Sequence, residues 1–287
     1  MLMNASSLFR HWGDRWHAAQ SIQARTSQSV FYGLGIYITM TVALIIAAVI
    51  VNNSLRFTEQ NILFVSRQPI FLPILVNTIV TSIYLALSTS IIVSRERDQG
   101  TLETLMHGPV DETAFLLGNF LAQLKVYGGL VLVAFVWANL LTWVLHLQYS
   151  FELAIVLITS IATTAAIIAL GLFVAMWGGR SRTTLVYFIL IILVIVGIQI
   201  SDEIVSNLVL ASNPTFNDPL ITVRNVLASA TSIVKWLSPY SQLEQAMGAL
   251  LDRAYLNYLV YLGVVLLQGT AFFTGSIWLL RRKGIRD

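Results

Sequence analysis

The stretch LAIVLITSIATTAAIIALGLFVAM, residues 153–176, contains no charged side chain over 24 residues. About 20 apolar helical residues are needed to cross the roughly 30 Å hydrocarbon core of a bilayer, because lipid offers no partner to backbone polar groups. The stretch also lacks the alternation with a period of two residues that a barrel strand requires. It therefore predicts a membrane-spanning α-helix.

Further apolar runs on both sides of this stretch extend the prediction to a helical bundle. Charged residues make up 11% of the chain, whereas a soluble domain carries roughly 25% because its surface faces water. We expect an all-α integral membrane protein with six spans, of which the fifth is the shortest. They are residues 30–51, 74–93, 126–145, 153–176, 183–200 and 256–280.

The distribution of Lys and Arg predicts the orientation of the bundle, since cytoplasmic connections retain positive charge. Twelve of the 17 basic residues lie on the side of the termini and five on the other side, whereas the 14 acidic residues divide equally. We therefore expect a multi-pass protein of the cell (inner) membrane with both termini in the cytoplasm. The same topology explains the net charge of +3, so nucleic acid is not an expected partner.

The segment before the first span, residues 1–28, has an apolar face. At 100° per residue one side of a helix carries Leu8, Phe9, Trp12, Trp16 and Ala19. Such a helix is expected to lie flat on the inner leaflet with Phe9, Trp12 and Trp16 as interfacial anchors, before a transmembrane domain over residues 29–287. The alternative is a disordered basic terminus that only enforces orientation.

The connection between the second and third spans reads SRERDQGTLETLMHGPVDETAFLLGNFLAQL, residues 94–124. Four charged residues end the apolar run, Thr101 is placed to cap a short helix, and Gly108 with Pro109 is placed to stop it. The apolar side of that helix consists of Leu102, Leu105 and Met106. Residues 94–112 thus predict a short amphipathic cytoplasmic helix, with an ordinary polar turn as the alternative.

A long outer segment, residues 201–255, separates the fifth span from the last. Four breakers near its middle precede an amphipathic stretch at residues 220–237, whose apolar side carries Leu220, Val223, Leu227, Ala230, Val234 and Leu237. This pattern predicts short helices before the last span. They either enter the outer leaflet or form a small cap packed on the bundle.

Polar residues inside the spans are few. The second span carries Asn77, Thr81, Tyr84 and Ser88 on one helical face, a stripe that either lines a substrate path or hydrogen-bonds a neighbouring helix. Lys125 lies at the start of the third span, where we expect it to reach the interface or to pair with a neighbour near Asp111 rather than to act in transport.

The 94–124 connection resembles the corresponding loop of ABC type-2 permeases. The stretch ERDQGTLETLMHGPVDETAFLLGNFLA contains a Glu-Arg pair, a Gly-Thr-Leu-Glu core, a Pro break and a Gly-containing third span, as in that family. A Ser-Pro turn at residues 238–240 and a basic end at residues 281–283 fit in outline. Asp98 and Gln99 depart from the pattern, because many members pass directly from the Glu-Arg pair to glycine.

The resemblance implies that this loop is a coupling helix seated in a cleft of a separate ATPase subunit. The residues given this role are Glu96, Arg97, Gly100, Thr101, Leu102, Glu103, Leu105 and Met106. It further implies pairing with a second copy or a homologous permease, with the interfacial helix as an elbow and the first, second and fifth spans near the pathway.

The chain lacks the phosphate-binding pattern G-x-x-x-x-G-K-[ST], so we expect a transport subunit that is not itself an enzyme. ATP and Mg²⁺ are expected on the partner ATPase, and no cofactor or metal on this chain. The expected function is export by alternating access. One alternative is an ATPase-driven scaffold that acts on an outer partner without moving a solute. A secondary transporter is the other, which the charge-free span centres disfavour. The sequence does not select the substrate.

Overall fold

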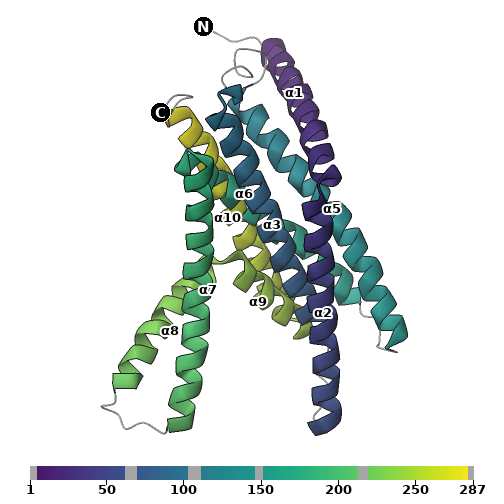
Figure 1. Ribbon diagram of the computed structural model, residues 1–287, viewed down its shortest axis with the longest axis vertical. Helices are drawn as coiled ribbons and strands as arrows, with labels where there is room; N and C mark the ends of the chain where they lie inside the picture. The colour runs from purple at the N-terminus through teal and green to yellow at the C-terminus, as the bar shows by residue number, and fades with distance from the viewer. Residues whose placement is uncertain (1–4, 62–69, 103–110, 146–150, 213–218, 284–287) are drawn as a thin grey trace.

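The computed structural model describes residues 5–61, 70–102, 111–145, 151–212 and 219–283, and within these ranges all regular structure is helical (Figure 1). The predicted all-α class is therefore confirmed. The helices are α1 (Ala5–Tyr32), α2 (Leu34–Asn61), α3 (Phe71–Asp98), α5 (Glu112–Val144), α6 (Phe151–Gly178), α7 (Ser181–Ser212), α8 (Pro219–Leu237), α9 (Pro239–Leu251) and α10 (Tyr255–Lys283).

Five of the described helices are long and apolar enough to cross a membrane. They are α2, α3, α5, α6 and α10, each of which contains most of one predicted span. The fifth predicted span falls in α7, whose described apolar part, Ser181–Ile195, is shorter. The start of α1 and the end of α10 lie at the same end of the bundle, called the termini end below (Figure 1).

The N-terminal segment is helical, and its helix continues beyond the expected residue 28. α1 continues to Tyr32, and the first span begins only after Gly33, whose N–H donates to the Val30 carbonyl at 3.1 Å. In Figure 1, α1 lies above α2 and slopes in much the same direction, rather than crossing the bundle at a right angle.

The reason for this placement is a close helix contact between α1 and α5. A Cβ atom added at Gly118 would lie only 2.8 Å from the Ala19 carbonyl oxygen and 2.8 Å from the Ile22 Cβ. Ala19 is accordingly fully buried, whereas the expected anchor Trp16 is about half exposed. The side chains of Phe9 and Trp12 lie outside the described part of the chain.

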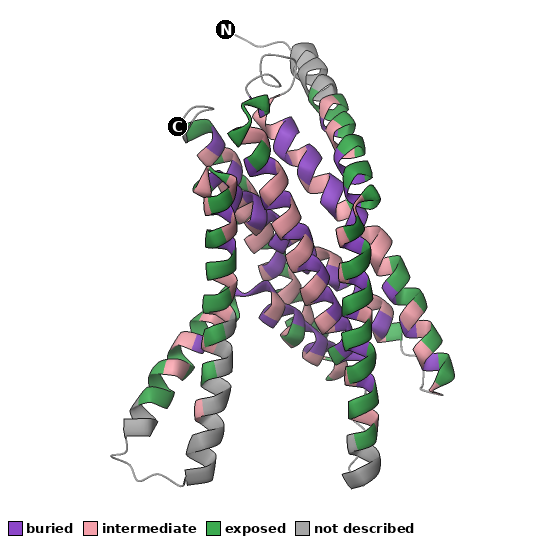
Figure 2. Ribbon diagram, in the orientation of Figure 1, coloured by how far each residue is buried: buried purple, intermediate pink, exposed green. Residues whose placement is uncertain are grey.

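α6 forms the centre of the bundle and packs against α3, α5, α7, α9 and α10. Its crossing with α3 is tight, because a Cβ atom at Gly171 would lie 2.6 Å from the Ala86 carbonyl oxygen. The Ser90 hydroxyl donates to the Gly171 carbonyl at 2.8 Å across the same crossing. Figure 2 shows the buried residues concentrated on these inner helices, with exposed residues along α2 and α8.

The outer segment forms two helices with different surroundings. α9 starts at the predicted Ser-Pro turn, is buried between α6 and α10, and its Tyr240 hydroxyl lies 2.8 Å from the Ser82 hydroxyl of α3. α8 packs mainly on α7 and lies apart from the central helices (Figure 1). The predicted apolar stripe of α8 is only partly covered, since Val223 and Leu237 are exposed.

Candidate functional site

The candidate site is the loop root, which we define as residues 94–102 and 111–113 on the two sides of the predicted coupling loop. α3 extends past the apolar run to Asp98 and is ended by Gly100, which has a φ of +70°. The N–H of Gly100 donates to the Arg97 carbonyl at 3.1 Å. Glycine adopts this left-handed conformation without strain, which explains its place in the motif.

The hydroxyl of Thr101 closes the same turn. It donates to the Glu96 carbonyl at 2.8 Å, and the Thr101 side chain is exposed. Thr101 and Leu102 are helical, and the rest of the helix that Thr101 was predicted to cap lies outside the described residues, as do Glu103, Leu105 and Met106. Thr101 is thus the exposed residue at the point where the described chain enters the loop.

The two side chains of the Glu-Arg pair, Glu96 and Arg97, contact two different helices. Oε1 of Glu96 lies 3.6 Å from Nη2 of Arg25 in α1, while Nη1 of Arg97 donates to the Met176 carbonyl of α6 at 3.5 Å. Both motif side chains are partly buried. The pair therefore braces the end of α3 against two other helices.

Asp98, which departs from the family pattern, makes the shortest contacts of the loop root to another helix. Its Oδ2 accepts from the backbone N–H of Ser181 at 2.8 Å and from the Ser181 hydroxyl at 2.7 Å. Ser181 is the first residue of α7, where a carboxylate satisfies free N–H groups and complements the helix dipole. Asp98 thus fastens the loop root to α7, a connection that the sequence analysis missed.

Leu102 has a different place from that of the other coupling residues. It is 0% exposed and packs with Val93, Phe115, Leu116 and Leu172 in one apolar cluster. Its side chain is therefore an anchor that holds the loop against the bundle, rather than a surface offered to a partner.

On the far side of the loop, Asp111 starts α5 as its N-cap. Its side chain accepts from the Glu112 N–H at 2.8 Å and from the Thr113 hydroxyl at 2.9 Å, and it lies 3.2 Å from Nη2 of Arg15. Desolvation raises the pKa of Asp111, but the Thr113 hydroxyl, the Arg15 charge and the Glu112 N–H outweigh it and hold the pKa below its ordinary value. Lys125 is exposed, and the ion-pair partner of Asp111 is Arg15.

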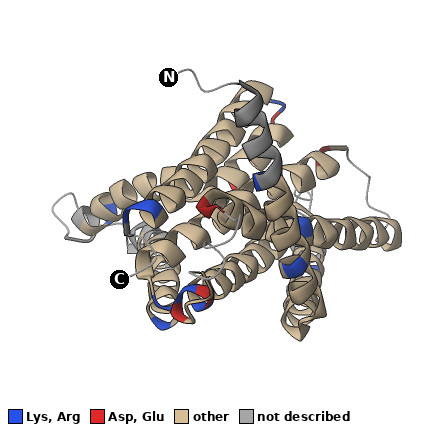
Figure 3. Ribbon diagram, turned by 90° about the horizontal axis from the view of Figure 1, so that it is seen from above, with Lys and Arg blue, Asp and Glu red and all other residues tan. Residues whose placement is uncertain are grey.

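A third ion pair joins Nε of Arg281 in α10 to Oε2 of Glu112 at 3.6 Å. All the ion pairs found among the described residues therefore involve the loop root. Figure 3, viewed from above, shows acidic and basic residues in neighbouring positions, while most of the helical ribbon carries no charge. In the described ranges no group of three or more His, Asp or Glu forms a metal site.

The polar stripe of the second span faces protein. Asn77 and Thr81 are buried, and the Thr81 hydroxyl donates to the carbonyl of Asn77 in its own helix at 2.6 Å. The Tyr84 hydroxyl would lie 2.5 Å from a Cβ atom at Gly35, so that Tyr84 packs on α2. Ser88 is half-buried. These contacts favour the helix-packing interpretation over a pathway.

A second group of polar residues in the bundle was only partly foreseen. The buried Tyr127 hydroxyl donates to the Ser160 hydroxyl at 2.9 Å and approaches the Thr78 hydroxyl at 3.5 Å. This group joins α3, α5 and α6. The signal that could have found it is the hydroxyl and alanine content of residues 153–176, which is typical of close helix contact.

A bundle of apolar helices whose charged contacts gather around one inter-helix loop has the architecture of a multi-pass membrane protein. The model of the family described as ABC-2 family transporter protein matches residues 68–285. The chain therefore belongs to the ABC-2 transporter family and is a transmembrane permease, as the loop motif predicted. No curated protein matches it. The matched range includes all helices from α3 to α10, whereas α1 and α2 precede it.

Proposed function

We propose that this permease is the membrane subunit of an ATP-driven exporter, and that separate ATPase subunits bind it at the loop root. The observation that carries the proposal is the set of contacts from the loop root to α1, α6, α7 and α10. A force applied to the loop would reach all these helices. ATP and Mg²⁺ belong to the ATPase in this complex.

The proposed topology has six spans with both termini in the cytoplasm. α7 supplies the remaining span, since its 32 residues are long enough and its described first half is apolar. The excess of Lys and Arg on the termini side supports a cytoplasmic position for that end of the bundle. This orientation places the loop root where a soluble ATPase can reach it.

Alternating access requires an element that transmits ATPase closure to the spans. Asp98 is the proposed link to α7, because one carboxylate binds both the N–H and the hydroxyl of Ser181. Arg25 with Glu96 is the proposed link to α1. Two copies, or this chain with a homologous permease, would pair with two ATPase subunits and move an amphipathic or lipid-like solute outward.

The proposal is tested by purifying the full chain under mild conditions together with the ABC ATPase that copurifies with it, and by reconstituting both in liposomes. We expect a stable complex whose ATP hydrolysis depends on the permease, and a complex that weakens in the variants Glu103→Ala and Thr101→Arg. Asp252→Ala, at the opposite end of the bundle, is the matched control. The proposal fails if the ATPase does not bind the chain, or if binding is the same in all variants. ATP turnover without movement of any amphipathic solute would indicate the scaffold instead.

A further inference from the structure

Two adjoining hollows lie on the side of the bundle where α5 and α10 face each other. The first, about 260 Å³, is bounded by Arg15 and Trp16 of α1, by the first turns of α5, and by Phe273 of α10. The second, about 270 Å³, lies between α5, α6 and α10. Leu117 and Phe273 line both, so the two hollows adjoin, and together they are called the groove below.

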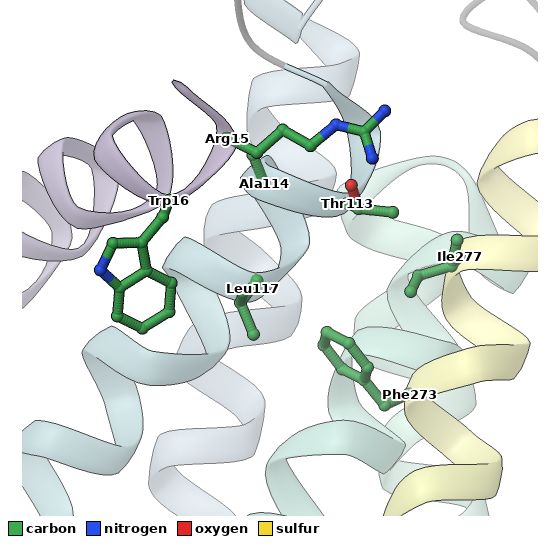
Figure 4. A pocket seen from close by; sticks show the side chains of 7 residues that line it. All are labelled: Arg15, Trp16, Thr113, Ala114, Leu117, Phe273 and Ile277. Carbon is green, nitrogen blue, oxygen red and sulfur yellow. The ribbon is translucent and has the colours of Figure 1, made fainter. Parts of the chain in front are cut away.

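The groove has one end lined by the cationic side chain of Arg15 and one end lined almost entirely by apolar side chains. Figure 4 shows the Arg15 side chain reaching across the first hollow towards Thr113, with Trp16 on one side and Phe273 on the other. Arg15 contacts Asp111 through one nitrogen, Nη2, and Arg281, about one helical turn beyond the lining residue Ile277, contacts Glu112 through Nε. Since a guanidinium has five N–H donors, both side chains keep donors for a further anionic group.

The second hollow continues away from these cations into the apolar part of the bundle. Its floor is made of small residues of α6, Ala162, Ala165 and Ala166, and Gly269 of α10 lies directly against Ala166. Its rim includes Leu266, which is 51% exposed on a helix long and apolar enough to span the membrane. The groove is thus open on the face that lipid surrounds.

We propose that this groove binds one phospholipid of the leaflet at the termini end. Its phosphate contacts the free donors of Arg15 and Arg281, and one acyl chain lies over Leu117 and Phe273 onto the alanine floor. The arrangement of polar and apolar groups matches that of a phospholipid: guanidinium groups suit phosphate, an aromatic ring at the interface suits the headgroup level, and a largely apolar groove suits the acyl chain. By joining α1 to α10, the lipid would stabilise the helices that hold the loop root.

The test uses the full chain in liposomes containing phosphatidylglycerol with a photoreactive diazirine in one acyl chain. After illumination, mass spectrometry locates the labelled residues. We expect labelling to concentrate on α5 and α10 residues that line the groove. Ala165→Leu fills its floor and should lower that labelling on the order of tenfold, as expected when about two methylene groups lose their burial. Arg15→Gln should lower it about fivefold, the effect of one interfacial cation.

Each variant has a matched control in the same chain. Ala271→Leu adds the same side chain at an exposed position of α10 outside the groove, and Arg182→Gln removes an exposed cation at the start of α7; both should leave the labelling unchanged. Labelling spread evenly over the lipid-facing helices, or equal in all variants, would overturn the proposal. So would capture of a second copy of the chain by a photoreactive residue at Thr270, because the groove would then be an interface between copies. These outcomes do not depend on ATPase binding.

Discussion

Both ends of the bundle contain a packed apolar cluster, but the ion pairs found among the described residues all lie at the termini end. At the termini end, ion pairs and hydrogen bonds between charged groups and helix ends join the loop root to α1, α6, α7 and α10. At the opposite end, an apolar cluster that includes Phe71, Leu153, Leu243 and Leu250 joins α3, α6 and α9. Exposed ionic contacts are individually weak and exchange readily, whereas packed cores deform little. The difference indicates that the termini end carries polar contacts that a partner can rearrange, while the apolar clusters keep the bundle intact.

The largest effect on stability should come from a substitution in the apolar cluster at the end opposite the termini. Leu243 is fully buried in α9, so Leu243→Ala should leave a cavity and lower the free energy of unfolding by about 3 kcal/mol. Unfolding of the purified protein in mixed micelles, followed by circular dichroism, measures this. Leu266→Ala on the exposed side of α10 removes the same atoms and should cost far less. Equal losses of unfolding free energy in the two variants would contradict the importance of this cluster for stability.

Asp98→Ala should impair ATP-driven transport much more than it lowers the stability of the protein. Losing a helix-capping carboxylate should lower the free energy of unfolding by only about 1 kcal/mol, because the contact is largely exposed. The same change should abolish most of the solute movement driven by ATP while the ATPase stays bound. Transport and binding measured on the same liposomes test this, with Asp252→Ala as the control. Wild-type transport by Asp98→Ala would show that α7 is not driven through this contact.

Acid should weaken the termini end before the opposite end. The pKa of Asp111 is lowered in the folded protein, so its stabilising contribution is fully present above its unfolded pKa, about 3.9, and is lost as the pH falls through the folded value. The midpoint of thermal unfolding in detergent should therefore differ between wild type and Asp111→Asn at pH 7, and this difference should shrink below about pH 4. A difference that stays constant with pH would exclude Asp111 as the titrating group.

The smallest effect is expected for Arg25→Gln. Arg25 is 76% exposed and lies 3.6 Å from Glu96, so its pair should contribute less than about 0.5 kcal/mol and should fade in high salt. Unfolding at low and at molar NaCl, with Arg182→Gln as the reference variant, measures this. If Arg25→Gln lowered the free energy of unfolding more than Asp98→Ala does, the proposed ranking of these two contacts by their contribution to stability would be wrong.

The parts of the fold that depend on local sequence could be predicted. Charge-free runs indicated the spans, and the Ser-Pro pair marked the junction of α8 and α9. The position of the first span was predicted too early, because Val30 belongs to the helix before Gly33. Apolar composition alone does not distinguish the end of one helix from the start of the next.

The contacts between distant segments could not be predicted in the same way. Asp98 and Ser181 are 83 positions apart, and nothing near either residue indicates the other. Leu102 looked like part of a partner-facing surface because it belongs to the motif, yet it lies in the core. The slope of α1 follows from Gly118 in another helix. Each of these three features depends on which helices pack against each other, and the hydropathy of a segment carries no information about its packing partner.

The most direct measurement for the central claim is site-specific cross-linking at the two ends. A photoreactive residue is placed either at Thr101, exposed at the loop root, or at Asp252, exposed at the other end, and cells are illuminated. We predict that the Thr101 probe captures a protein carrying the pattern G-x-x-x-x-G-K-[ST], and that the Asp252 probe does not. Capture of such an ATPase from neither position, or from Asp252 alone, would contradict the proposal that the loop root is where the ATPase binds.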